Sequence, residues 1–232
     1  MPSDDAGAAT GARRGRPPQT PEQAEEVRAR IVAATADVFT CGGSRGLSVT
    51  RIIDAAGLAR PTFYRYFANA VEPLHVLLTE SNAGLVGGIV AALGGTDEPV
   101  ELGIRLIDAY LDWARGHGPM LRPLFAELHD PVSPVSHYRE LAFDDIRAAV
   151  RATFTALGRA VPSPLDLDAA LHVCEYVVYR ISAEVDPGQE PHPDTVAAAR
   201  LTMIRVLLTT LGTRADVEYA LGIPDLFPTP QD

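Results

Sequence analysis

The chain has 232 residues, of which 47% are hydrophobic and 22% are charged, and its formal net charge is −10 at pH 7. It contains no apolar run near the roughly 18 residues of a membrane span and no signal-peptide profile, so we expect a soluble, cytoplasmic protein of one or two domains. Its two cysteines give no disulfide framework, and its six histidines lack metal-ligand spacing, so neither a metal nor a cofactor is predicted.

The charge is distributed unevenly along the chain. Residues 1–67 carry nine arginines against seven carboxylates, whereas residues 68–232 carry eleven arginines against twenty-three. The total charge alone argues against a nucleic-acid partner, but a basic head in front of an acidic body would orient the protein on a duplex. The chain has no lysine, which excludes a P-loop or Schiff-base lysine.

Residues 1–19 are rich in Gly, Ala, Pro and Asp, a composition that predicts a disordered arm. Within it, the tract RRGRPP at residues 13–18 is similar to the core of an AT-hook, an extended arm that fits a narrow minor groove. DNA contact by Arg13, Arg14 and Arg16 is therefore one interpretation, and a solubilising tail is the other.

The sequence TPEQ at residues 20–23 is a capping box with proline at the first helical position, which predicts a helix that continues to about residue 41. The following turn, GGSRG at residues 42–46, matches the G-x-S-x-G pattern of hydrolases, with Ser44 as nucleophile. In hydrolases this pattern joins a strand to a helix, whereas here it joins two predicted helices. We therefore interpret the match as chance and predict that the chain is not an enzyme.

Residues 48–67, SVTRIIDAAGLARPTFYRYF, predict two short helices joined by a glycine turn. Ser48 is a good N-cap for the first helix, Gly57 supplies the positive φ that ends it, and Pro61 falls in the first turn of the second. Phe63 and Phe67 are expected to face the core. This pattern is typical of a helix-turn-helix, whose second helix lies in the major groove of DNA.

The run from Ile53 to Phe67, IDAAGLARPTFYRYF, resembles the signature of the TetR/AcrR transcriptional regulators, I-x-x-A-G-[VL]-x-x-x-T-[FL]-Y-x-[HY]-F. The resemblance covers about residues 25–78 and implies a three-helix DNA-binding head on a larger helical body. Two positions depart from the family pattern. Ala59 replaces the usual serine or threonine cap, and Ala70 replaces a lysine that often meets a phosphate, so we expect a weaker grip on the DNA backbone.

Side chains of both short helices are candidates for DNA contact. Arg60 is best placed to reach a guanine edge, and the hydroxyls of Tyr64 and Tyr66 can reach phosphates while their rings pack on a sugar or a thymine methyl. For Arg60 and Arg65 a solvated face is the alternative, and only one of the two need touch a base. The predicted contacts are Ser48, Thr50, Arg51, Ala59, Arg60, Thr62, Tyr64, Arg65 and Tyr66.

The rest of the chain predicts further helices separated by proline and glycine. We place them at about 70–93, 98–117, 119–129, 134–158, 165–186, 193–212 and 214–222. No period-two strand pattern is present, so the sequence predicts an all-α protein. We expect an arm (1–19), a helix-turn-helix domain (20–68) and a helical regulatory domain (69–232).

Two of these helices carry aromatic and polar groups along one side, a pattern typical of a small-molecule cavity. The candidate ligand-binding residues are Leu106, Tyr110, Trp113, His172, Glu175, Tyr176 and Tyr179. Ordinary core packing explains any single one of them equally well. A buried Glu175 would need a partner, such as His172, an arginine or a ligand donor. The family resemblance implies an apolar effector between the middle helices.

The predicted helices at 165–186 and 193–212 are apolar around more than one face. We expect them to pair with their two-fold mates in a homodimer, with Leu208 as a candidate interface position. Together these patterns predict a sequence-specific regulator that binds double-stranded DNA, most simply a repressor released from a pseudo-palindromic operator by a small hydrophobic effector. An effector-independent architectural DNA-binding protein and a serine hydrolase are the alternatives.

Overall fold

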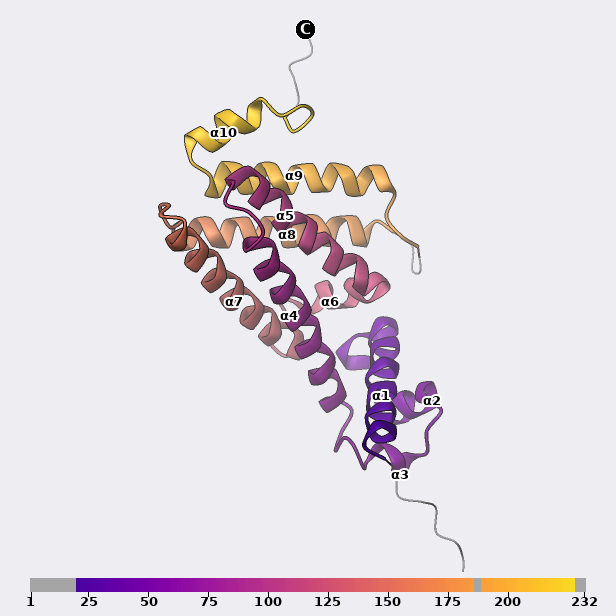
Figure 1. The fold of residues 1–232 in the computed structure, drawn as a ribbon. Coiled ribbons are helices and arrows are strands. Elements are labelled where there is room, and N and C mark those ends of the chain that lie inside the picture. Colours follow the sequence, from indigo (N-terminus) through magenta and orange to yellow (C-terminus); the bar gives the residue numbers. More distant parts are fainter. Residues whose placement is uncertain (1–19, 186–188, 228–232) are drawn as a thin grey trace, which may run out of the picture.

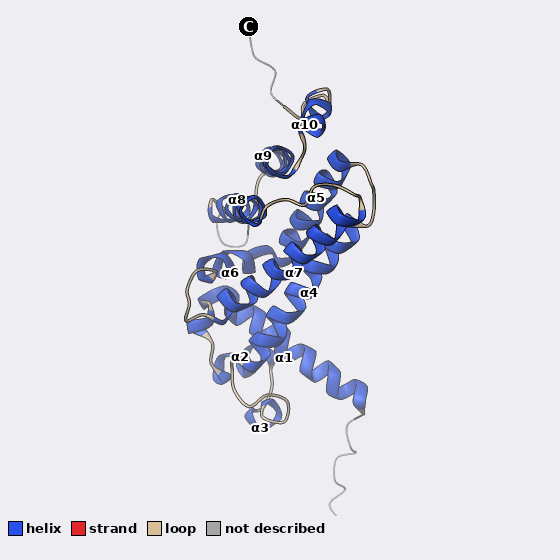
Figure 2. Ribbon diagram, turned by 90° about the vertical axis from the view of Figure 1, so that its left-hand side faces the viewer, coloured by secondary structure: helices blue, strands red, loops and turns tan. Residues whose placement is uncertain are grey.

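The structure is a computed structural model that describes residues 20–185 and 189–227. All regular elements in these ranges are helices, which confirms the all-α prediction (Figures 1 and 2). The arm with Arg13, Arg14 and Arg16 lies outside the described residues. The elements are α1 (Pro21–Gly42), η1 (Ser44–Gly46), α2 (Val49–Ala56), α3 (Arg60–Phe63), α4 (Glu72–Leu93), α5 (Pro99–His117), η2 (Gly118–Met120), α6 (Leu121–Glu127), α7 (Pro134–Ala156), α8 (Pro164–Ala183), α9 (Pro193–Leu211) and α10 (Arg214–Leu221).

Most helices begin where local capping rules place them. The Thr20 hydroxyl accepts the N–H of Gln23, and the Gln23 side chain accepts the N–H of Thr20, so the predicted capping box opens α1. Ser133 and Ser163 cap α7 and α8 by accepting the N–H groups of Val135 and Asp166, and each is followed by proline at the first helical position. Both side-chain oxygens take up backbone donors that the first turn leaves unpaired.

Helix α8 ends at Ala183 rather than near residue 186, and two further elements differ from their expected bounds. The connecting helix begins at Glu72 rather than Ala70, because the Asn69 side chain accepts the N–H groups of Val71 (2.9 Å) and Glu72 (3.1 Å) and holds a turn ahead of the helix. The segment expected as one helix over 119–129 is the 3₁₀ helix η2 followed by α6, after Gly118 takes a φ of 48°.

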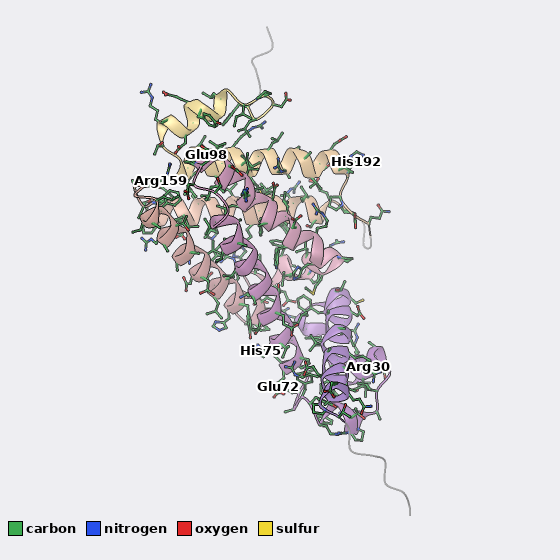
Figure 3. The ribbon with its side chains drawn as sticks, viewed as in Figure 1. Arg30, Glu72, His75, Glu98, Arg159 and His192 are labelled. Atoms are coloured by element: carbon green, nitrogen blue, oxygen red, sulfur yellow. The ribbon has the colours of Figure 1, made fainter. Side chains whose placement is uncertain are left out.

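The molecule is elongated, with α1, α2 and α3 forming a head at one end (Figure 1). Helix α4 leads from the head into the body, where it packs against α5 and α7. Helices α8 and α9 lie side by side and are seen end-on at the edge of the body in Figure 2. In Figure 3, Glu72 and His75 mark the start of α4 near the head, whereas Glu98 and Arg159 lie at the far end of the body.

The head and the body have separate apolar cores, and the partly buried side chains of Leu47 and Leu77 pack against both. The head core contains Ile31, Ile52 and Phe63, all fully buried. Phe39, although it lies on α1, is fully buried in the body core together with Leu74 of α4. The end of α1 is therefore anchored in the body by the burial of an aromatic ring.

Helix α4 is long and apolar enough to cross a membrane by length and composition alone. Its buried residues include Leu78, Leu85 and Ile89, which belong to the body core. Much of its exposed side consists of small residues such as Gly84 and Gly87. Core packing therefore accounts for the large side chains of this helix.

Candidate DNA-binding head and effector cavity

The helix-turn-helix is built from local signals. The Ser48 hydroxyl accepts the N–H of Arg51 (3.2 Å) and caps α2. Gly57 takes the left-handed conformation, with φ 62° and ψ 39°, and ends the helix as expected. Phe63 and Phe67 are buried in the head core, which fixes the angle of α3 against α2.

The second helix of the motif is short. Regular α-helix ends at Phe63, and the next three residues form a tighter turn in which the Arg65 N–H bonds the Thr62 carbonyl and the Tyr66 N–H bonds the Phe63 carbonyl. Ala59 precedes α3 without a side-chain cap, the consequence of the departure noted in the sequence. Tyr64, Arg65 and Tyr66 therefore project from a turn rather than from helix.

Arg60 and Tyr64 form one exposed unit on this turn. The Arg60 Nη2 donates to the Tyr64 hydroxyl (3.3 Å), and the guanidinium lies 5.7 Å from the centre of the Tyr64 ring. The Tyr64 ring is itself held edge-on by Phe63 (5.6 Å between ring centres). Stacked on a fixed ring, the guanidinium is preorganised for planar, bidentate recognition of a base edge or a phosphate.

The other residues predicted to contact DNA differ in solvent exposure and in the contacts they make within the protein. Thr50 is exposed, and Thr62 is half-buried. The Arg51 guanidinium donates to the Gly46 carbonyl (2.8 Å), so it holds the turn before α2. The Tyr66 ring is half-buried against the head core, with the Arg65 guanidinium 5.9 Å from its centre. DNA contact by these residues stays a prediction.

The G-x-S-x-G turn has no hydrolase geometry. Ser44 begins the 3₁₀ helix η1 between two helices, whereas a nucleophile elbow follows a strand. No hydrogen bond joins its hydroxyl to a histidine within the described ranges. Cys41 is exposed near the end of α1.

A cavity of about 80 Å³ lies within the body among α4, α5, α7, α8 and α9. Its wall is almost entirely apolar. The lining residues are Leu85, Ile89, Leu106, Ile107, Tyr110, Phe143, Ile146, Arg147, Val150, Leu167, Ala170, Leu171, Cys174, Leu207 and Leu211. Burial raises the pKa of the Cys174 thiol to about 12, so this sulfur is a neutral, inert part of the wall.

Leu106 and Tyr110 are the predicted ligand-binding residues that the structure places on this wall. The Tyr110 hydroxyl makes no hydrogen bond in the part of the chain that the structure describes, and its burial raises its pKa well above the usual value. It therefore stays a neutral donor. The Trp113 ring stacks on Tyr110 (5.7 Å), and its indole N–H donates to the Ser81 carbonyl (3.1 Å), behind the cavity wall.

The polar residues predicted on α8 lie elsewhere. Glu175 is buried and paired with Arg139, whose Nε and Nη2 reach its two carboxylate oxygens at 2.6 and 3.3 Å. His172 Nε2 lies 2.9 Å from Arg139 Nη2. Tyr176 and Tyr179 are exposed on the outer side of α8, 61% and 39% accessible. Effector contact by these four residues stays a prediction.

Arg139 is the buried residue that sequence reasoning missed. The sequence required a partner for a buried Glu175, and left histidine and arginine open. Arg139 lies on α7, 36 positions away, and its guanidinium also covers the Phe143 ring at 4.4 Å. Because Arg139 pairs with Glu175, neither residue leaves an uncompensated charge in the body.

These features, a helix-turn-helix with an exposed arginine–tyrosine unit and an all-helical body with an internal cavity, define a DNA-binding regulator with a separate helical body. Residues 31–69 match the family model of bacterial regulatory proteins of the tetR family. The head of the chain is therefore a DNA-binding domain of the TetR family of transcriptional regulators.

Individual relatives are distant. The chain is 27% identical over 101 residues to the HTH-type transcriptional activator FasR of Mycolicibacterium smegmatis, and this match spans 44% of the chain and 46% of the relative. The chain thus spans less than half the length of this curated relative. Its fold is similar to the fatty acid degradation regulator FadR from Bacillus halodurans, with TM-score 0.64, 19% identity, and 81% and 97% of the two chains covered.

A second structural relative carries a ligand. Thermus thermophilus FadR, a repressor solved in complex with lauroyl-CoA, aligns with TM-score 0.52 and 23% identity, covering 81% of this chain and 96% of that one. Members of the family therefore bind DNA, and some respond to ligands. At this identity the likeness shows the fold and leaves the effector of this chain to be established.

The head makes the first testable prediction. Replacing Arg60 with alanine removes a planar donor, so we expect a loss of about 1 to 3 kcal/mol in operator binding and relaxed specificity at one position per half-site. Tyr66→Phe removes a hydroxyl that can meet a phosphate, so it should weaken binding to all sequences alike. Fluorescence anisotropy with an operator and a scrambled duplex measures both, and an equal loss on both duplexes for Arg60→Ala would contradict base reading.

Proposed function

We propose that the protein is a sequence-specific transcriptional repressor that leaves a pseudo-palindromic operator when a small hydrophobic effector enters the body. The observation that supports this proposal is the apolar cavity among α4, α5, α7, α8 and α9. Helix α4 contributes Leu85 and Ile89 to its wall and leads directly to the head. A ligand that separates the walls therefore acts on the helix that carries the DNA-binding unit.

The size of the cavity supports a mechanism by displacement. A volume of about 80 Å³ is smaller than the roughly 150 Å³ cavity known to hold one benzene. A longer apolar ligand can be fully enclosed there only if the helices move apart. Occupancy then favours a wider body, and the head moves away from the spacing that matches successive major grooves, about 34 Å apart.

The charges around the cavity favour an uncharged effector. Arg147 is the cation among the lining residues, and it already bonds Asp144 (2.8 Å) and Asp168 (2.7 Å). A buried carboxylate would therefore find no free cation and would remain unpaired, which is costly. The Tyr110 hydroxyl offers a donor to a neutral acceptor such as an ester or thioester carbonyl. Lauroyl-CoA, bound by the Thermus relative, contains a thioester carbonyl, but its CoA phosphates are charged, so only its acyl chain and thioester fit this description.

The effector prediction is tested with a matched pair of probes. Methyl laurate should raise the melting temperature and weaken binding to an operator selected from random duplexes, whereas lauric acid at pH 8 should bind at least about tenfold more weakly, because its charge is unpaired. Tyr110→Phe should lower ester affinity about three- to tenfold through the loss of one hydrogen bond. Thermal shift and anisotropy provide the readouts.

Tyr219→Phe serves as the control, because Tyr219 is exposed on α10 and does not line the cavity. Equal affinity for acid and ester would contradict the uncharged effector while leaving effector release intact. An unchanged operator affinity with every apolar probe would instead favour the architectural DNA-binding alternative. We propose no catalytic role for Ser44. A regulator that binds DNA acts in the cytoplasm, and we propose no membrane location for this protein.

We also propose a homodimer through α8 and α9. Leu208 is 3% exposed and belongs to the core of the protomer, so the sequence-based choice of this residue as an interface position is corrected. The outward side of the pair instead presents Tyr176 of α8 and Thr202 of α9. Both helices lie at the edge of the body (Figure 2), where a two-fold mate can reach them.

The dimer prediction has a matched control in the chain. Tyr176→Glu places a charge in the proposed interface, so we expect monomers and a loss of cooperative operator binding. Tyr219→Glu makes the same change at a tyrosine with the same 61% exposure on α10, and it should leave the dimer intact. Analytical ultracentrifugation distinguishes them. If only Tyr219→Glu dissociated the dimer, the interface would lie at α10 instead.

A further inference from the structure

The turn between α1 and α2 connects two helices of the head and also contacts the body. Gly43 has φ 62° and ψ −167°, a backbone conformation open essentially to glycine. A Cβ atom at this position would also collide with Oε1 of Glu127, the last residue of α6. Backbone conformation and close approach therefore both require glycine here.

One carboxylate joins three elements at this junction. Glu127 Oε1 accepts the backbone N–H of Ser44, the first residue of η1, at 2.7 Å. Its Oε2 accepts the hydroxyl of Ser133, the buried cap of α7, at 2.5 Å. Hydrogen bonds to a charged acceptor are stronger than neutral ones, and this junction is partly shielded from water.

A second, weaker link lies beside it. Arg45 of η1 pairs with Asp130 at 3.0 Å, but the Arg45 side chain is 84% exposed. Exposed ion pairs contribute little to stability and even less in salt. Glu127 is therefore the polar contact on which the head depends at this junction, and the Arg45–Asp130 pair provides a natural comparison.

We propose that Glu127 is a positioning residue for operator binding: it fixes the orientation of the head on the body by capping the η1 turn. Besides the exposed Arg45–Asp130 pair, the head is joined to the body by the chain through α4 and by apolar side chains, among them Phe39 and Leu47, that pack in or against the body core. The apolar contacts have no preferred direction, whereas the Glu127 hydrogen bond fixes the backbone of the turn that leads into α2. Without it, the head can rotate about α1 and α4 while remaining folded.

The hydrogen bond between Glu127 and Ser44 can also respond to movements of helices in the body. Phe125, two residues before Glu127, is buried in the body core and lies 6.4 Å from the Tyr179 ring of α8. A movement of α8 away from α5 therefore shifts α6, and with it the carboxylate that holds the turn. This inference rests on the proposed DNA-binding function, and it assigns the G-x-S-x-G match a role in docking the head.

The test uses the spacing of the operator half-sites, which a purely structural role would not affect. Wild-type protein first selects an operator from random duplexes, and binding is then measured to variants with one base pair inserted or two removed at the centre. We expect wild type to lose at least about tenfold on each altered spacing. Glu127→Ala should bind the selected operator more weakly and lose less than about threefold on altered spacings, with single half-site affinity unchanged.

Arg45→Ala is the matched control, because the pair with Asp130 is the contact its exposed guanidinium makes among the described residues, and it should retain the wild-type spacing preference. Gly43→Ala is the second variant, since its Cβ displaces the Glu127 carboxylate, and it should reproduce the effect should Glu127→Ala fail to fold. Circular dichroism verifies folding. A wild-type spacing preference in both Glu127→Ala and Gly43→Ala would overturn the inference, whereas failure of wild type to select any spaced operator would instead overturn the proposed function.

Discussion

The burial of Phe39 is the constraint on which the arrangement of the molecule depends. This ring begins on a head helix and ends in the body core, beside Leu74 of α4. Pulling it out would expose apolar area to water, at a cost of about 2 kcal/mol or more for an aromatic side chain. The ring anchors the head together with the partly buried Leu47 and Leu77, which pack against both cores, and we propose that the polar contact of Glu127 fixes the orientation of the head.

The body contains an apolar cavity, and several of its buried or partly buried charged side chains form ion pairs. Arg139 pairs with Glu175 on one side of the cavity, and Arg147 pairs with Asp168 on another. Arg200 likewise bonds Asp108 and ties α9 to α5. Paired charges fix the helix register without offering a site to an anion. The proposed effector would therefore be recognised by its shape and apolar area rather than by charge.

Similarity to known proteins is strongest in the head, over residues 31–69. The constraints there are local, since the turn needs Gly57 and the small core needs Phe63. The body shares its fold with distant relatives at 19% and 23% identity, because helical packing tolerates many apolar combinations of similar volume. A cavity lined by such residues can change its ligand while the fold persists.

The sequence by itself determined what nearest neighbours control: the capping box of Thr20 and Gln23, the positive φ of Gly57, and the all-helical architecture. It also required a partner for a buried Glu175. Only the tertiary structure decided that the partner is Arg139, that Leu208 is internal and that Ser44 docks on Glu127, 83 positions away. Capping and helical period act within a few residues, whereas these contacts depend on how separate helices pack against one another.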